Sequence, residues 1–402
     1  MSRLRNILAG ATALVALALP AAAQTNVKIG ILSDMSSLYT DLAGAGSVIA
    51  ARMAVEDFGA AAKGIKVDFV SADHQNKPDV GSNVARQWID VDKVDVIVDV
   101  PNSGVALAVN EVVKEKNKVF LVSGAASSAL TGTACSPNTA HWTYDTWALA
   151  NGTGSAIVKT GGDTWFFLTA DYAFGHQLEA DTSAVVTKMG GKVVGTVRHP
   201  LNSNDFSSFL LQAQSSKAKI IGLANAGGDT VNSIKQAAEF GIVRSGQNLA
   251  GLLVFLTDVH ALGLETAQGL IMTEAFYWDQ NEASRAFAKR FSAADKGIHP
   301  TMVHAGVYSS VLHYLKAVAA LKNAADGKAV VEKMKATPTD DVLFGKGELR
   351  KDGRKIHDMY LFEVKKPSES KAPWDYYKLR ATIPAAQAFR PLADGKCPIA
   401  GG

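Results

Sequence analysis

The chain has 402 residues, of which 47% are hydrophobic and 20% are charged, and its formal net charge at pH 7 is +3. These proportions are typical of a globular protein and exclude a disordered or fibrous chain. With so weak a charge, and without a basic run interleaved with aromatic residues, we expect no nucleic-acid partner.

The first 23 residues have the layout of a secretory signal peptide. Arg3 and Arg5 precede an apolar run, residues 7–19, that is too short to span a bilayer, and Ala21 and Ala23 supply small residues at the −3 and −1 positions. We therefore expect cleavage after Ala23 and export of the rest of the chain. That remainder is too long for one core and suits two lobes.

Strands and helices then alternate along the first half of the exported chain. Short apolar runs predict strands at residues 27–32, 66–72, 94–100 and 119–122. Helical periodicity predicts helices at residues 47–58, 79–91 and 105–115, the second of them entered through Pro78. This alternation predicts βαβ units and a doubly wound parallel sheet.

Residues 134–154 interrupt the alternation, and a second series follows. It predicts strands at residues 165–169, 192–197, 218–224 and 252–256, with helices at 175–189, 206–214 and 231–240. Two α/β halves of similar size in tandem are the main architectural signal. We predict an α/β protein with two doubly wound lobes.

The C-terminal part is less regular. We predict a strand at residues 270–278, helices at 282–294 and 302–321, and a hairpin in which residues 351–354 connect strands 348–350 and 359–364. The last thirty residues contain four prolines and are predicted to be an irregular tail.

Signatures of catalysis, metal binding and cofactor binding are missing. The run at residues 152–160 resembles a phosphate loop but lacks a glycine immediately before Lys159. His299 and His304 are separated by Pro300, and no acidic residue lies at metal-ligand spacing from them. Asp99 is interpreted as the solvated end of a strand. We expect a protein that is not an enzyme and that holds neither a metal nor a cofactor.

Polar loops follow four of the predicted strands, at residues 33–40, 101–104, 123–128 and 170–175. Open α/β sheets bind ligands at the carboxyl ends of their strands. Hydroxyl groups and free backbone N–H groups at helix starts suit a carboxylate. Each serine taken alone is equally well explained as a helix cap, but three successive strand ends carry the same chemistry.

The chain has two cysteines, Cys135 and Cys397. In an exported protein an isolated pair is more often a structural disulfide than a redox centre or a metal site. Such a bond would fasten the C-terminal tail to the first half of the chain. The sequence alone leaves open whether the two thiols meet.

Four stretches resemble the periplasmic solute-binding proteins of ABC transporters, specifically the branched-chain amino acid type. They are Lys28-Ile-Gly-Ile31, Ala54-Val-Glu-Asp57, residues 119–127 and Asp171-Tyr-Ala-Phe-Gly175. The resemblance implies the type I periplasmic binding fold, with three segments crossing between two lobes that close on a ligand. It implies a first lobe of residues 24–145 and 277–345, a second lobe of 146–276 and 346–390, and a tail of 391–402.

Carried over residue by residue, the resemblance also implies a ligand site. The carboxylate of the ligand would be held around Asn102, Ser103, Gly124, Ala125, Ala126 and Ser127. The first-lobe wall would comprise Tyr39 and Leu42, and the second lobe would contribute Tyr172, Phe174, Asn225 and Ala226. Asp258 lies near the position where the family places an acid for an α-ammonium group, and Tyr277 is one of several aromatic residues expected near the cleft.

One departure from the family pattern bears on the ligand. Phe174 stands where the amino-acid binders often have tyrosine, so a hydroxyl contact is lost. An aromatic carboxylate therefore remains open as a ligand beside a branched-chain or other amino acid, since aromatic rings stack on one another.

The resemblance implies a monomeric periplasmic receptor that captures a small carboxylate and delivers it, unchanged, to a membrane permease. Two alternatives are weighed against this role. An exported sensing module for a signalling receptor would use the same pocket. An exported hydrolase would need a nucleophile with a base in reach, and no residue pair in the sequence indicates one.

Overall fold

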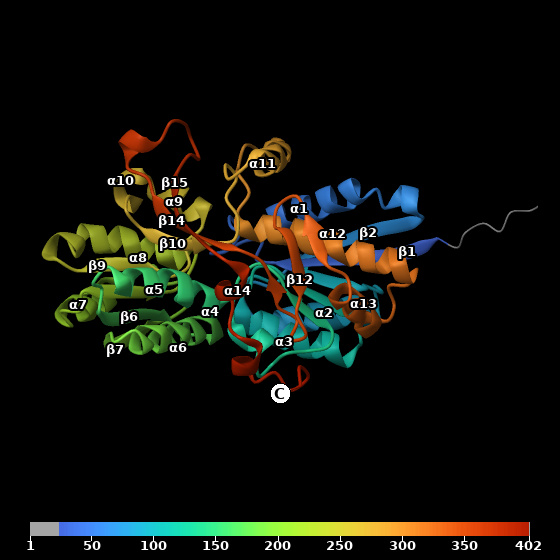
Figure 1. Cartoon of the computed structure of the whole chain (residues 1–402), viewed down its shortest axis with the longest axis horizontal. Helices are drawn as coiled ribbons and strands as arrows, with labels where there is room; N and C mark the ends of the chain where they lie inside the picture. The colour runs from blue at the N-terminus through green and yellow to red at the C-terminus, as the bar shows by residue number, and fades with distance from the viewer. Residues whose placement is uncertain (1–23, 402) are drawn as a thin grey trace, which may run out of the picture.

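Two parallel sheets, one at the centre of each lobe, organise the computed structural model, which describes residues 24–401 (Figure 1). The two lobes lie side by side along the long axis of the molecule, which confirms the predicted fold class. The predicted signal peptide, residues 1–23, lies outside the described residues. Within residues 24–401, no helix combines the length and the hydropathy needed to cross a membrane.

The first lobe contains a five-stranded sheet in the order β2-β1-β3-β4-β5, and all of its neighbouring strands are parallel. β3 and β4 are buried along their whole length, which explains their continuous apolar sequence. The strands are β1 (Thr25–Ser33), β2 (Ile65–Asp73), β3 (Val96–Asp99), β4 (Val119–Val122) and β5 (Thr139–His141).

Helices cover both faces of this sheet. On one face α1 (Gly44–Phe58) packs beside α12 (Met302–Leu321), although the two helices are far apart in the sequence (Figure 1). α13 (Gly327–Lys335) continues that layer. On the other face lie α2 (Pro78–Asp90) and α3 (Ser103–Glu115). Asn102 fixes the start of α3, because its side chain accepts a hydrogen bond from the Val105 N–H.

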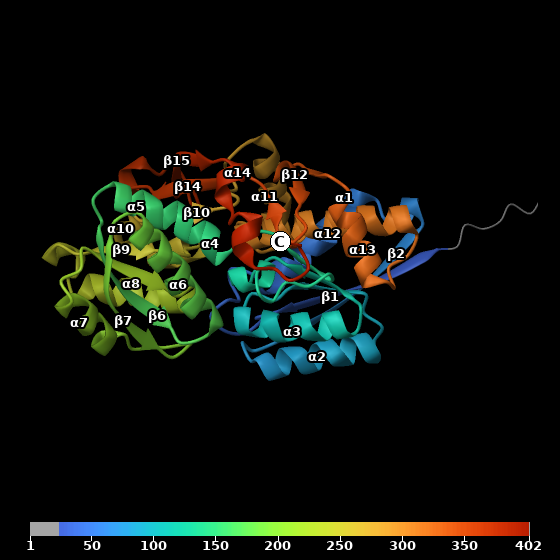
Figure 2. The same cartoon turned by 60° about the horizontal axis from the view of Figure 1, so that its bottom comes forward.

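The second lobe contains a four-stranded parallel sheet in the order β7-β6-β8-β9. α5 and α6 pack on one face, and α7, α8 and α9 pack on the other, so two layers of helices enclose the sheet (Figure 2). The strands are β6 (Thr164–Ala170), β7 (Lys192–His199), β8 (Ile220–Ala224) and β9 (Asn248–Gly251). The helices are α4 (Thr146–Leu149), α5 (Ser155–Lys159), α6 (Ala173–Lys188), α7 (Ser207–Ser215), α8 (Gly228–Glu239), α9 (Leu256–Leu262) and α10 (Leu264–Ala267).

The chain passes between the two lobes three times. The first crossing leads from β5 into α4, and the second from β10 (Ile271–Glu274) into α11 (Glu282–Ala294). α11 is attached to the first lobe by a bidentate ion pair between Arg290 and Asp57 of α1. The third crossing leads from β13 (Lys355–Ile356) to β14 (Met359–Val364). The exact residues assigned to each lobe remain a prediction.

Two antiparallel sheets accompany the crossings and correct the predictions for the C-terminal part. β12 (Gly345–Leu349) pairs with β11 (Thr339–Asp341) and β13, whereas β14 pairs with β10 and β15 (Tyr377–Ile383). The predicted hairpin between residues 348–350 and 359–364 is therefore wrong, and part of the predicted irregular tail is a strand. Apolar patterning identifies strands but not their partners, and here the chain changes lobe between the two strands.

The strand predicted at residues 252–256 is also wrong. The strand of this region, β9, ends at Gly251, and Leu256 begins α9. Residues 252–255 form a loop whose side chains are all nearly inaccessible to solvent. A continuous apolar run indicates burial, and here Phe255 is buried against Tyr144 of the first lobe while Val254 is buried in the core of the second lobe, neither of them inside a sheet.

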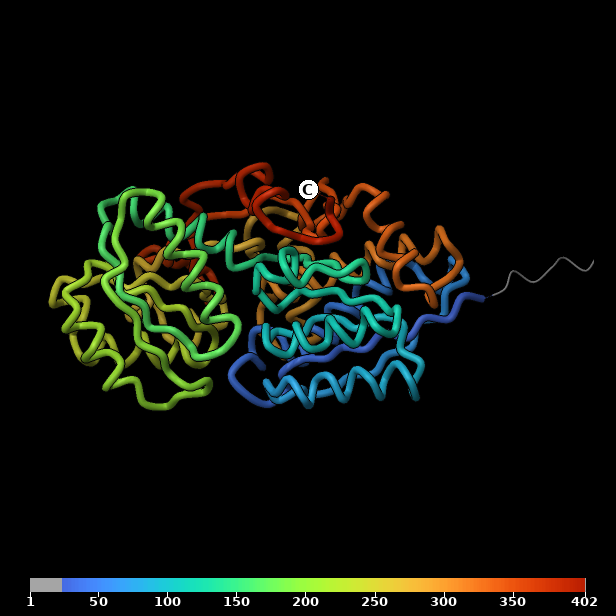
Figure 3. The backbone as a smooth tube through the Cα atoms, turned by 90° about the horizontal axis from the view of Figure 1, so that it is seen from below, coloured from blue at the N-terminus to red at the C-terminus, as the bar shows by residue number. Residues whose placement is uncertain are grey.

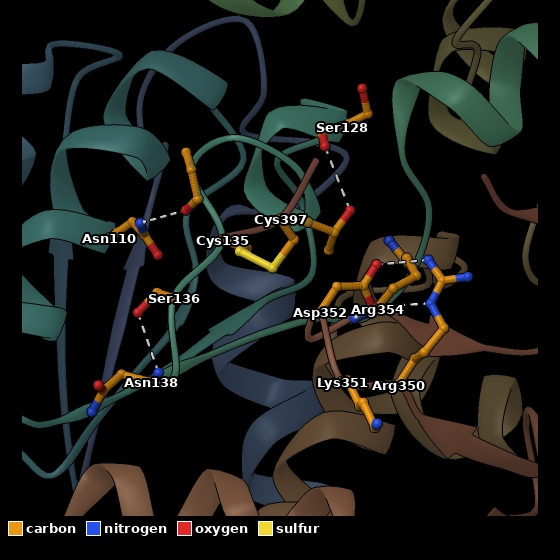
Figure 4. The surroundings of a disulfide bond; sticks show 12 residues. Asn110, Ser128, Cys135, Ser136, Asn138, Arg350, Lys351, Asp352, Arg354 and Cys397 are labelled. Atoms are coloured by element: carbon orange, nitrogen blue, oxygen red, sulfur yellow. Dashed lines mark hydrogen bonds and ion pairs between the residues drawn. A yellow bond between two sulfur atoms is a disulfide. The ribbon is translucent and has the colours of Figure 1, made fainter. Parts of the chain in front are cut away.

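Cys135 and Cys397 are joined by a disulfide, with their Cα atoms 5.6 Å apart and 262 residues between them in the sequence (Figure 4). Arg390 strengthens this attachment by donating a hydrogen bond to the Ser128 carbonyl. The chain's last segment is thus fastened to the first lobe, near the loop that follows β4.

Candidate ligand-binding site

A small cavity lies between the lobes, and its free space of about 230 Å³ includes some that is open to solvent. Every residue that lines it follows a parallel strand: the first lobe contributes from the ends of β1, β3, β4 and β5, and the second from those of β6, β8 and β9. This is where open α/β sheets bind ligands. The lining residues are Tyr39, Leu42, Pro101, Gly124, Ala126, Tyr144, Tyr172, Phe174, Ala226, Leu253 and Phe255. Figure 3 shows the two lobes meeting side by side.

Five aromatic rings dominate the cavity wall, and none of the lining side chains carries a charge. Tyr144 packs edge-on against Phe255 of the other lobe, with ring centroids 6.1 Å apart. The Tyr144 hydroxyl donates to the Gly124 carbonyl at 2.6 Å, which fixes the ring against the β4 loop. Aromatic walls of this kind suit a ligand with a flat or branched apolar part, because such a part makes extensive contact with the faces and edges of the rings.

The serine-rich loop after β1 does not present free hydroxyls. Ser33 donates to Asp99 and Ser37 to Asp34, and Ser36 is hydrogen-bonded to Asp73. Asp99 is fully buried, so its interpretation as a solvated strand end is wrong, and burial raises the pKa of its carboxyl to about 6. In this loop the hydroxyls hold the backbone in place.

The residues expected to hold a carboxylate lie together at the ends of β3 and β4. The Ser103 hydroxyl accepts hydrogen bonds from the backbone N–H groups of Ala126, at 3.3 Å, and Ser127, at 3.1 Å. Gly124 and Ala126 line the cavity, whereas Asn102, Ser103, Ala125 and Ser127 are buried behind the lining residues.

Three more residues of the expected site are also outside the lining. Asp258 caps its own helix, α9, by accepting from the Phe255 N–H at 2.9 Å, and burial raises the pKa of its carboxyl to about 7. Asn225 accepts a hydrogen bond from Thr230 within the lobe. Tyr277 donates to the Trp374 carbonyl at 3.1 Å and packs in the core.

Four lining residues were absent from the predicted site: Pro101, Tyr144, Leu253 and Phe255. Tyr144 and Pro101 lie directly after strands, where the strand-end rule applies. Leu253 and Phe255 were hidden by the incorrect strand at 252–256. Had that strand been ended at Gly251, the same rule would have included both.

His304 has a structural role. His304, one member of the pair considered above, is buried and hydrogen-bonded to the Ala43 carbonyl at 2.9 Å, and burial lowers the pKa of its ring to about 4. Across residues 24–401 there is no group of three or more His, Cys, Asp or Glu side chains that could hold a metal ion.

The comparisons with known proteins agree with one another. A family model described as periplasmic binding protein matches residues 26–371. A periplasmic binding protein from Burkholderia mallei is 54% identical, with a TM-score of 0.90 over 93% of this chain and 99% of that one. A branched-chain amino acid ABC transporter periplasmic ligand-binding protein from Burkholderia xenovorans is 43% identical, with a TM-score of 0.82 over the same shares. A Leu/Ile/Val-binding protein homolog from Brucella melitensis is 27% identical over 274 residues, 66% of this chain and 68% of that protein.

Proposed function

The chain belongs to the periplasmic binding protein family, and we propose that it is the receptor of an ABC importer that captures a small carboxylate between its lobes. The observation that carries this proposal is the interlobe cavity, which is built from strand ends of both lobes and lined by uncharged side chains, five of them aromatic. The Burkholderia xenovorans relative is described as a ligand-binding protein of such a transporter. The family implies a periplasmic location, which the N-terminal signal peptide would provide.

Ser103 lies behind the cavity lining, and among the residues expected to hold the carboxylate it is one with a hydroxyl proton left to donate. Its two acceptor positions are occupied by the N–H groups of Ala126 and Ser127, so the proton of its hydroxyl is left to donate. Ser103 is also the first residue of α3, where unsatisfied N–H groups and the helix dipole favour a negative charge. The aromatic walls would hold the rest of the ligand, and no covalent step is involved.

The uncharged lining bears on the choice between an amino acid and an aromatic acid. An α-ammonium group would need an acidic partner, and the carboxylate of Asp258 is already hydrogen-bonded to the Phe255 N–H. An aromatic or aliphatic carboxylate without an ammonium group would place its body against the rings of Tyr144, Tyr172 and Phe174 and would need no acid.

Titration calorimetry and thermal unfolding of the mature protein test the proposal. The panel contains branched-chain amino acids, the 2-oxo acids of the same carbon skeletons, and benzoic acids. We expect at least one of these to bind and to raise the melting temperature, and to be recovered from the complex unchanged. If none binds, or if a ligand is recovered chemically altered, the proposal is wrong.

A matched pair of serine variants tests the carboxylate site. Ser103→Ala removes the hydroxyl behind the cavity lining, and Ser136→Ala removes an equally buried hydroxyl that accepts from the Asn138 N–H and belongs to no lining residue. Ser103→Ala should weaken binding about tenfold or more, the cost of one hydrogen bond to a charged group. Ser136→Ala should leave affinity unchanged. Equal affinities of the two variants would remove Ser103 from the site.

A further inference from the structure

One loop of the first lobe reaches across to the second lobe at the mouth of the cavity. We call residues 34–39 the closing arm. The Tyr39 hydroxyl lies 2.5 Å from the Tyr172 hydroxyl, and the Leu38 carbonyl accepts a hydrogen bond from the Gly228 N–H at 3.2 Å. Tyr172 lies just before α6 and Gly228 begins α8, so the arm contacts two separate elements of the second lobe.

A single buried carboxylate sets the shape of the closing arm. Asp34 is inaccessible to solvent and accepts hydrogen bonds from the backbone N–H groups of Ser36, Ser37 and Tyr39. It also accepts from the Ser37 hydroxyl and from the Asn76 amide. Burial alone would raise the pKa of this carboxyl, but these donors outweigh burial and lower it, so Asp34 remains ionised.

The position of Tyr39 follows directly from this arrangement. The Tyr39 N–H is bonded to Asp34 Oδ2 at 2.9 Å, and the same oxygen accepts from Asn76 and Ser37. Buried side chains with several charge-assisted hydrogen bonds have one orientation, so the Tyr39 hydroxyl is placed before the lobes meet. Tyr39 is itself nearly inaccessible to solvent, which limits competition from water.

We propose that the closing arm is an interlobe latch, in which Asp34 is the positioning residue that holds Tyr39 against Tyr172. The latch stabilises the closed arrangement through contacts between protein groups, and its strength sets the affinity for whatever the cavity holds. The latch depends on the proposed function only in its effect on ligand affinity. Apparent affinity falls in proportion to the fraction of closed protein, so a weaker latch weakens the binding of every ligand alike.

The test is a double-mutant cycle between the lobes. Tyr172→Phe removes the second-lobe hydroxyl, and Asp34→Asn removes an acceptor that the arm needs. One net hydrogen bond predicts a loss of affinity of about fivefold to tenfold for Tyr172→Phe. We expect Asp34→Asn to weaken binding to a similar extent in the native background and to have little further effect in the Tyr172→Phe background. Equal effects of Asp34→Asn in the two backgrounds would overturn its role as a positioning residue.

A second readout needs no ligand. Spin labels on cysteines introduced at the exposed positions Asn83 of α2 and Ser208 of α7 report the distance between the lobes. Tyr172→Phe and Tyr39→Phe should both shift ligand-free protein toward longer distances. Tyr308→Phe is the control, because it removes a hydroxyl that is bonded to Asp57 inside the first lobe, and it should cause no shift.

The two readouts separate the latch from the proposed function. If no solute in the panel binds but the distances lengthen as expected, the latch stands and the proposed function is wrong. If a solute binds but neither Tyr39→Phe nor Tyr172→Phe changes the distance distribution, the latch is wrong and the proposed function stands. Tyr39→Phe leaves Asp34 intact, so the distance test does not depend on the folding of Asp34→Asn.

Discussion

Gly227 is the position where one methyl group should keep the lobes apart. It precedes α8 with φ at 56° and ψ at −132°, and a Cβ placed there would lie 2.4 Å from the Leu38 carbonyl oxygen of the other lobe. Ordinary contacts of a Cβ begin at 3.4 Å, so Gly227→Ala requires the lobes to separate by about 1 Å at this point.

A separation of about 1 Å breaks the neighbouring interlobe hydrogen bonds. The Tyr39–Tyr172 hydroxyl distance would rise from 2.5 Å to about 3.5 Å and the Gly228–Leu38 distance from 3.2 Å to about 4.2 Å, both longer than ordinary hydrogen bonds. Two net hydrogen bonds amount to about 2 kcal/mol, so the affinity of Gly227→Ala should fall about thirtyfold. The backbone strain of alanine at positive φ adds a loss of stability of about 1–3 kcal/mol.

Gly263→Ala is the control for that strain. Gly263 also lies in the second lobe with a positive φ, of 74°, and a Cβ there would meet no atom within 4 Å. Both variants should therefore lose a similar amount of thermal stability, and only Gly227→Ala should lose affinity in titration calorimetry. Native affinity in Gly227→Ala would refute the reasoning, because it would mean that ligand binding does not need the lobes to approach as they do here.

Three further outcomes are expected. Burial raises the pKa of Asp258 to about 7 in the folded protein, so its ionisation alone should remove up to about 4 kcal/mol of stability as pH rises from 4 to 7. Burial also raises the pKa of Asp99, Asp229 and Glu274, which add losses of the same sign. Urea unfolding at several pH values should show that Asp258→Asn loses less stability over this range than the native protein, and an unchanged pH dependence would contradict the assignment. Cys397→Ser should cost about 2–5 kcal/mol, as should reduction of the native protein, measured by melting temperature. Arg354→Met should cost about 3–5 kcal/mol in urea, because it leaves a buried Asp145 and two backbone carbonyls of the first crossing without their partner.

The lobes were predictable because their signals are local. The alternation of apolar runs with amphipathic helices locates each strand end, and the end of a parallel strand is where a ligand site forms. The loops at residues 33–40 and 170–175 were located in this way. Tyr39, Tyr172 and Phe174, which the family resemblance singled out within them, line the cavity. Residues 302–321 were predicted as one helix, and α12 has the same bounds.

The crossings were not predictable because their partners are distant in sequence. Arg354 donates to the carbonyls of Trp142 and Tyr144, more than 200 residues earlier, and so joins the third crossing to the first. Arg354 is also fully buried, which no periodic pattern indicates for a charged residue. A single sequence contains no signal that relates the two segments.

The role of the serines in the β1 loop was misjudged for a different reason. A serine at a strand end suits a carboxylate only if its hydroxyl is free, and that depends on acids elsewhere. Asp73, at the end of β2, and Asp99, at the end of β3, engage Ser36 and Ser33 of the β1 loop. Parallel strands end at the same edge of the sheet, so polar residues at their ends lie close enough to form hydrogen bonds with one another. Groups that are paired in this way are not free to bind a ligand.

The small number of hydrogen bonds in the latch limits how strongly it can stabilise the closed arrangement. A ligand shifts the lobes only by the difference between its contacts in the closed and open arrangements. Hydrogen bonds at Tyr39 and Leu38 stabilise the closed arrangement by about 1 kcal/mol each, which is smaller than the contribution of several aromatic contacts to a ligand. A latch of this size raises the fraction of closed protein without holding an empty receptor shut. Release then requires the loss of the two hydrogen bonds of the latch and of the Ser128–Asp181 hydrogen bond once the ligand contacts are gone.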